Sequence, residues 1–170
     1  MNPSNRWPAL PLSEWKDTYA TLHMWTQIVG KIRLALCAPT NHWWSTAFYV
    51  TARGLTTSPI PYEKGIFEVH FDFINHALEI QTSLGETRTF RLVPRTVAAF
   101  YEEFMAALHS LGINVKVWEM PAEVPRPVRF TLDPAQPHDP GLATFRSVSF
   151  PTALWCCPPL PRLRQRFFRS

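Results

Sequence analysis

The fold is decided by the stretch IFEVHFDFINHALEIQT, residues 66–82, in which apolar and polar side chains alternate one by one. Its first half places four apolar residues on one face: Phe67, Val69, Phe71 and Phe73. The positions between them carry polar side chains: Glu68, His70 and Asp72. A period of two predicts a β-strand that is covered on one face. Asn75 and His76 then turn the chain back into Leu78 and Ile80, which predicts a β-hairpin.

Three further elements are predicted after the hairpin. TRTFRLV, residues 87–93, predicts another antiparallel strand, because the connections are too short for parallel crossovers. Pro94 and Thr96 open a predicted helix that Gly112 ends. The apolar residues of this helix recur every three or four positions: Val97, Phe100, Phe104, Ala107, Leu108 and Leu111. INVKVW, residues 113–118, predicts a last strand.

Before the hairpin, the pattern predicts one helix and two strands. The helix starts at Leu12 with Ser13 as its N-cap and Gly30 near its end. Its expected apolar face contains six residues: Leu12, Trp15, Tyr19, Leu22, Thr26 and Val29. KIRLALC, residues 31–37, and WWSTAFYVTARG, residues 43–54, then predict strands. The order α-β-β-β-β-β-α-β predicts an α+β fold, with an antiparallel sheet of about five to six strands and both helices on one face.

The positive charge of the chain is concentrated near its C-terminal end. Residues 1–140 hold 12 of the 17 Lys and Arg and all 13 Asp and Glu, so 12 − 13 gives −1. Residues 141–170 hold five Arg and no acidic residue, which gives +5. Because the part expected to fold is close to neutral, the charge does not favour nucleic acid as a partner.

Composition divides the chain into three predicted segments. Residues 7–120 form the α+β domain, and residues 121–140 form a Pro-rich extended connection. Residues 141–170 show neither helical nor strand periodicity. We expect this basic tail to be disordered, or to be non-native sequence of the kind that a frameshift produces.

No apolar run approaches the ~20 residues that span a bilayer, so no membrane segment is predicted. The N-terminal stretch MNPSNRWPALPLSEW lacks the features of a signal peptide, so a cytoplasmic protein is expected. Cys37 falls in a predicted strand, where it would be a small buried apolar residue. Cys156 and Cys157 are adjacent, which is not the spacing of a zinc site. We therefore expect neither a metal nor a cofactor.

Five blocks of this sequence are specific when taken together: LHMWTQIVGKIRLAL, NHWW, YVTARGLTTSPIPY, FDFINHALEI and FYEEFMAALHSLGINVKVW. They resemble a bacterial family known as domain of unknown function 5996, from about Trp7 to Asp139. Members of that family are nearly twice as long. The resemblance therefore implies the N-terminal half of a two-lobed protein, in which a surface that packs on the second lobe is exposed. It implies no activity or ligand.

The densest group of polar and aromatic residues lies in NHWWSTAFYVTARGLTTSPIPY, residues 41–62. An Arg beside a hydroxyl-rich loop suits a carboxylate or phosphate, and an adjacent Trp can stack on a planar or sugar-like group. The candidate ligand-binding residues are Asn41, His42, Trp44, Arg53, Thr56, Thr57 and Ser58. The structural alternative is a central strand in which Trp43 and Trp44 fill the core, followed by a rigid loop.

An enzyme is the rival hypothesis, with His42 or His70 as the general base and Asp72 or Glu68 orienting it. Alternate side chains lie ~7 Å apart along a strand, which is wide for a shared metal. The alternative is a solvated polar face. The chain contains no P-loop, GxGxxG, HExxH or GxSxG motif.

One more polar group recurs at steps of four on the first predicted helix: His23, Gln27 and Lys31. We interpret it as an ordinary helix edge. The leading hypothesis is therefore a domain that binds a small polar or anionic ligand through residues 41–58. A structural half-domain that pairs with a second lobe or with itself is the third hypothesis, and a large exposed apolar patch would indicate it.

Overall fold

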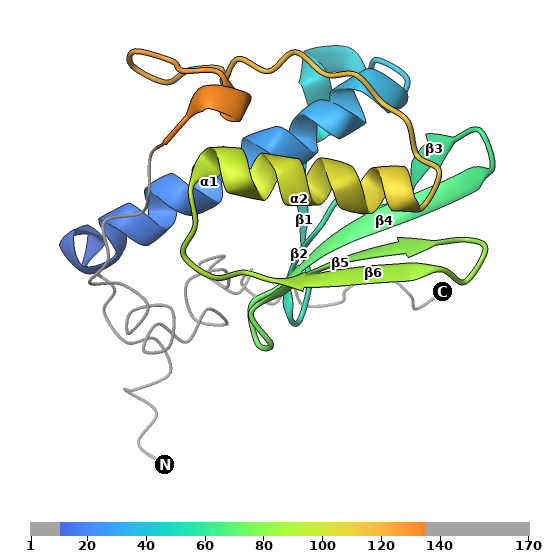
Figure 1. Cartoon of the computed structure of the whole chain (residues 1–170), viewed down its shortest axis with the longest axis horizontal. Helices are drawn as coiled ribbons and strands as arrows, with labels where there is room; N and C mark the ends of the chain where they lie inside the picture. Colours follow the sequence, from blue (N-terminus) through green and yellow to red (C-terminus); the bar gives the residue numbers. More distant parts are fainter. Residues whose placement is uncertain (1–10, 135–170) are drawn as a thin grey trace, which may run out of the picture.

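The predicted hairpin forms the middle of the sheet in the computed structural model, which describes residues 11–134 (Figure 1). β4 (Gly65–Asp72) and β5 (Ala77–Thr82) pair antiparallel, with Val69 opposite Ile80. Both of these side chains are buried, whereas the polar residues of β4 remain partly exposed on the other face. The one-sided alternation therefore identifies the covered face of the sheet correctly.

Four shorter strands complete this sheet: β1 (Tyr49–Val50), β2 (Gly54–Thr56), β3 (Ile60–Tyr62) and β6 (Thr87–Arg91). The strand order is β1-β2-β4-β5-β6, and β3 pairs with β4 beside β2. All pairings are antiparallel. The expected α+β class, with an antiparallel sheet of about five to six strands and two helices, is thus confirmed.

The first helix, α1 (Leu12–Leu36), is longer than predicted. Residues 31–37 were predicted as a strand, and this is wrong: the helix continues through them and Cys37 is its C-cap. The helix does not end at Gly30. The first residue that cannot continue it is Pro39. The N-cap is Pro11 rather than Ser13.

The buried face of α1 also differs from the prediction. Leu12 and Tyr19 were expected to be inside, but they are 59% and 50% exposed. The residues that α1 buries are Thr18, Thr21, Trp25, Ile28, Val29, Ile32 and Arg33. The prediction placed the aromatic residues near the start of the helix on the buried face. The observed buried stripe instead begins with Thr18 and Thr21.

The strand predicted over residues 43–54 is mostly absent. Asn41–Thr46 form a short 3₁₀ helix, η2, in which His42 and Trp43 have left-handed φ values of 53° and 58°. Trp43 and Trp44 are 66% and 70% exposed, so they do not fill the core. The stretch is partly apolar on both alternating faces, and such a pattern does not indicate a buried side.

The second helix, α2 (Val97–Ser110), agrees with the prediction. The Thr96 side chain caps it by accepting a hydrogen bond from the Ala99 amide (3.0 Å), and Gly112 follows its end with φ 72°. Trp25 of α1 stacks on Phe100 of α2 with ring centroids 4.7 Å apart. The two helices lie together on one face of the sheet (Figure 1).

Residues 113–134 run back over the helices on the side away from the sheet (Figure 1), and we call this segment the strap. Residues 113–118 were predicted as a last strand, which is wrong, because they pair with no strand of the described sheet. Val115 and Val117 still pack on the core. Their alternation with exposed residues is real, although the segment joins no strand of the described sheet.

The strap ends in a short 3₁₀ helix, η3 (Phe130–Leu132), whose Phe130 is fully buried and stacks on Tyr101 with ring centroids 6.0 Å apart. No helix within residues 11–134 is long and apolar enough to cross a membrane. The predicted basic tail, with Cys156 and Cys157, lies outside the described residues.

Candidate functional site

The predicted ligand residue Arg53 is engaged within the sheet. Its Nε and Nη2 donate hydrogen bonds of 2.9 and 2.7 Å to Oδ2 of Asp72. The other carboxylate oxygen of Asp72 accepts from the backbone amides of Ile74 (2.9 Å) and Asn75 (3.0 Å) in the β4–β5 turn. This carboxylate therefore joins the turn to the residue before β2.

These contacts change the acidity of Asp72. Partial burial acts to raise its pKa, but hydrogen bonds from the amides of Asn75 and Ile74 and from Arg53 outweigh that effect. The pKa of Asp72 is therefore lowered below its ordinary value. A carboxylate in this state is a stabilising anion rather than a general base.

Thr57 has a structural role between β2 and β3. It is fully buried, and its hydroxyl donates to the Ser58 carbonyl (2.9 Å) and accepts from the Val69 amide (3.0 Å). Its own amide donates to the Val69 carbonyl (3.0 Å). Thr57 thus keeps β4 hydrogen-bonded where its partner changes from β2 to β3. Thr56 accepts from the Ser58 amide (3.1 Å), so its hydroxyl is engaged within the loop.

The histidines of the enzyme hypothesis lie on different elements. Asn41 and His42 are exposed on η2, and the His42 ring lies 6.4 Å from that of Trp44. His70 lies on β4, with its Nε2 3.2 Å from Oε2 of Glu68. The candidate residues therefore form three groups: Arg53 with Asp72, His42 with Trp44, and His70 with Glu68.

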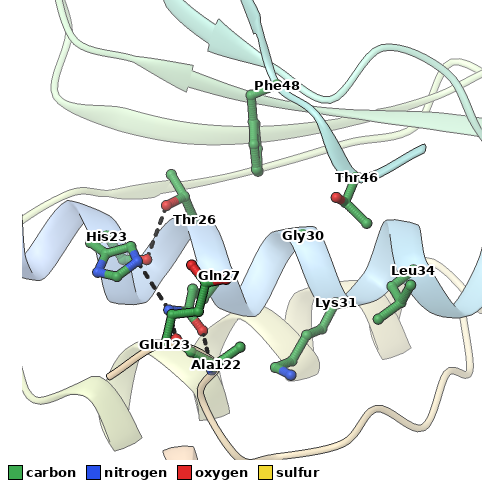
Figure 2. A pocket seen from close by; sticks show the side chains of 10 residues that line it. All are labelled: His23, Thr26, Gln27, Gly30, Lys31, Leu34, Thr46, Phe48, Ala122 and Glu123. Atoms are coloured by element: carbon green, nitrogen blue, oxygen red, sulfur yellow. Dashed lines mark hydrogen bonds between the residues drawn. The ribbon is translucent and has the colours of Figure 1, made fainter. Parts of the chain in front are cut away.

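A groove lies elsewhere, along α1, and has a volume of about 320 Å³ (Figure 2). The helix forms its floor, the η2–β1 connection forms one wall, and the strap forms the other. Its lining residues are His23, Thr26, Gln27, Gly30, Lys31, Leu34, Thr46, Phe48, Ala122 and Glu123. The edge of α1 that carries His23, Gln27 and Lys31 is thus the polar side of a concave surface.

Gly30 lies in the middle of the groove floor, where it has no side chain to occupy the space. A Cβ at this position would lie 3.7 Å from Cε2 of Phe48, which is an ordinary contact. Packing therefore does not require glycine here, although glycine inside a helix costs about 0.5–1 kcal/mol relative to alanine. Because glycine has no side chain, the groove is deeper at this position.

Lys31 supplies a positive charge without an acidic partner. Its amine lies 6.0 Å from the Phe130 ring centroid, and it makes no salt bridge with any residue in the described part of the chain. Burial lowers the pKa of Lys31 below its ordinary value. An anion in the groove would therefore gain a charge that no protein group neutralises.

Gln27 fastens the strap to the groove floor. Its Nε2 donates to the Ala122 carbonyl (2.8 Å), and its Oε1 accepts from the Ala122 amide (2.7 Å). Nε2 also lies 3.0 Å from Nε2 of His23 (Figure 2). With the Gln27 amide donating, His23 accepts through this nitrogen. The amide thus sets the position of the wall that carries Glu123.

Arg33 holds the other wall. It is 5% exposed, and its Nη1 donates to the Ala47 carbonyl, which lies between Thr46 and Phe48. Its guanidinium also lies 5.9 Å from the Tyr49 ring centroid. Within residues 11–134 its Nε has no hydrogen-bond partner. This buried cation fixes the η2–β1 connection against α1.

Comparison with protein families gives a match over most of the chain. Residues 7–144 match the model of a family described as a family of unknown function (DUF5996). The chain belongs to this family. No curated protein and no solved structure matches it. These comparisons assign neither an activity nor a ligand to this DUF5996 domain.

The polar edge of α1 was interpreted from the sequence as an ordinary helix edge, whereas in this DUF5996 domain it forms one side of the groove. The helical spacing of His23, Gln27 and Lys31 placed them together, but it gave no sign of what faces them. Phe48 and Ala122 were missed because their segments were predicted as a strand and a connection. Within residues 11–134 no group of three or more His, Cys, Asp and Glu could hold a metal ion.

Proposed function

We propose that this domain binds a small polar molecule in the groove along α1. The observation that supports this most directly is the floor, where Gly30 leaves a space beside Lys31 and Phe48. The proposal retains the expected ligand class and relocates the site from residues 41–58 to α1. The 41–58 stretch contributes through Thr46 and Phe48, which form one wall.

The size and lining of the groove suit a metabolite. A volume of about 320 Å³ equals that of roughly ten water molecules and lies at the lower end of the range for ligand pockets. Phe48 and Leu34 offer apolar surface, whereas Lys31 and Glu123 offer charge. A few polar groups among apolar walls are typical of small-molecule sites.

A thermal-shift screen of the full chain against a metabolite library tests this proposal. Gly30→Leu should fill the floor and abolish the shift, while Ala20→Leu, on an exposed part of the same helix, should preserve it. A compound that stabilises the parent and Ala20→Leu but not Gly30→Leu supports the groove. The proposal is contradicted if no compound in the library binds, or if a binder stabilises both variants equally.

A second function, pairing with another lobe or chain, is favoured by exposed aromatic residues. Trp43, Trp44 and Trp118 are each at least 66% exposed. Large exposed aromatic side chains are enriched at interfaces. Sedimentation of the parent and of Trp43→Ser/Trp44→Ser would test self-association; a parent that stays monomeric at high concentration contradicts pairing with itself.

We also propose a cytoplasmic location in a bacterium, on the sequence features described above and the absence of a membrane-crossing helix in residues 11–134. Fractionation of a bacterial host that expresses the chain would test this. Recovery with periplasmic markers would contradict it.

A further inference from the structure

Two opposite charges line the groove without neutralising each other. Lys31 extends from α1, and Glu123 belongs to the strap. Among the described residues, neither makes a salt bridge. A groove with a single charge would select an anion or a cation, whereas this one presents both.

The surroundings of Lys31 leave its charge for a ligand. Its amine lies over the ring of Phe130, a buried residue that provides no anionic oxygen. The carboxylate of Glu119, which also belongs to the strap, accepts from the Thr131 hydroxyl (2.8 Å). A partly buried cation is stabilised when a carboxylate contacts it.

The backbone at Glu123 is held beside the groove. Glu123 is exposed and has a left-handed φ of 56°, directly after the residue that Gln27 fixes through two hydrogen bonds. The Gln27 amide uses both of its polar atoms on Ala122, so it does not occupy the Glu123 carboxylate. The backbone of this acid is therefore held in place, and its carboxylate lines the groove.

We propose that the groove takes an amino-carboxylate zwitterion. Its carboxylate pairs with Lys31, its protonated amine pairs with Glu123, and its connecting carbons lie over Gly30 against Phe48 and Leu34. This inference rests on the proposed function, because it names the class of ligand for the same groove. It adds the requirement that both charges be on one molecule.

Three probes of similar length test the requirement: aminohexanoate, hexanoate and hexylamine, each titrated into the full chain by calorimetry. We expect aminohexanoate to bind at least about tenfold more tightly than either single-charge probe, since a hydrogen bond to a charged group is worth about that factor or more. Equal affinities for the three probes, or preference for a singly charged probe, would overturn the inference.

Charge-removing variants assign each end of the probe. Lys31→Gln should reduce aminohexanoate binding to the level of hexylamine, and Glu123→Gln should reduce it to the level of hexanoate. The matched controls are Lys16→Gln and Glu102→Gln, which remove exposed charges from the helices outside the groove and should leave binding unchanged. Retention of full affinity in either groove variant would contradict the assignment.

Failure of this inference can be distinguished from failure of the proposed function. A library compound that is lost in Gly30→Leu but carries only one charge overturns the zwitterion and leaves the groove as a binding site. Absence of binding by the three probes and by the whole library overturns both.

Discussion

Gln27 and Ala122 exchange two hydrogen bonds of 2.8 and 2.7 Å, although 95 positions separate them in the chain. A side-chain amide here takes the place of a neighbouring strand, since it satisfies both the amide and the carbonyl of one backbone residue. The pair connects the groove floor to the strap and thereby determines the width of the groove.

Gln27→Leu should loosen the strap without unfolding the domain. Both hydrogen bonds are lost at an exposed position, so we expect a decrease of about 1–2 kcal/mol in the free energy of unfolding. Hydrogen exchange at Ala122 and Phe130 should accelerate, while β4 and β5 remain protected. Gln81→Leu, at an exposed site on β5, is the control. Unchanged exchange in the strap would show that the amide does not hold it.

Gly30→Ala should stabilise the domain by about 0.5–1 kcal/mol, because alanine is the better helix former and its Cβ meets only an ordinary contact at 3.7 Å. Gly112→Ala should do the opposite, since its φ is 72° and its Cβ would lie 2.9 Å from Nζ of Lys64. Urea denaturation midpoints measure both. A destabilising Gly30→Ala would mean that the groove cannot accept even a methyl group.

Lys31→Met should raise the melting temperature at neutral pH by about 1–2 °C. Burial lowers the pKa of Lys31 in the folded state, so the unfolded chain binds the proton more tightly and folding is penalised while the amine is charged. The penalty is complete below the lowered pKa of the folded state and is lost as pH rises from there to the pKa of the unfolded chain, so the difference between parent and variant should shrink over that range. Lys16→Met should show no such trend. A less stable Lys31→Met would indicate that the amine has a stabilising partner.

Asp72→Asn should cost about 2 kcal/mol at pH 7, because the carboxylate accepts charge-assisted hydrogen bonds from Arg53. The pKa of Asp72 is lowered in the folded state, so its contribution is complete above the unfolded pKa and is lost as pH falls through the folded one. The gap between parent and variant should therefore close below roughly pH 4. Asp17→Asn, exposed on α1, is the control. A gap that persists in strong acid would argue against this pair as its source.

Thr57→Val should destabilise the sheet by about 1–3 kcal/mol, since it leaves the buried amide of Val69 without an acceptor. Valine keeps the shape of the side chain, so the loss of stability measures the contribution of the hydroxyl. Thr89→Val, at an exposed position on β6, should change stability little. Chemical denaturation followed by tryptophan fluorescence measures both variants. Equal effects would show that the hydroxyl bridge is dispensable.

Periodicity predicted the elements whose pattern is one-sided. β4 and β5 alternate against a single covered face, and α2 has its cap at Thr96 and its stop at Gly112. The residues after Gly30 alternate as a strand would, yet Ile32 and Arg33 complete the buried stripe of α1. The missing information was tertiary, because that stripe is recognisable only once α2 lies against it.

The candidate site, too, could be predicted only in part. Its floor is a local pattern, since His23, Gln27 and Lys31 follow one another at helical steps. Its walls come from residues 46–48 and 122–123, and no local pattern reports a contact across 95 positions. Arg53, which was predicted to bind a ligand, and Asp72, which was predicted to orient a general base, instead contact each other through the register of β2 with β4.

The strap also gives the domain an order of assembly. During synthesis α1 is made first, but the residue that closes its groove follows 95 positions later, which takes about 5–20 seconds at the usual rate of translation. Until then the apolar stripe of α1 lacks some of its packing partners, and the nascent chain contains no complete groove. A molecule that binds there would recognise only chains whose strap is in place and would favour them over partly folded ones.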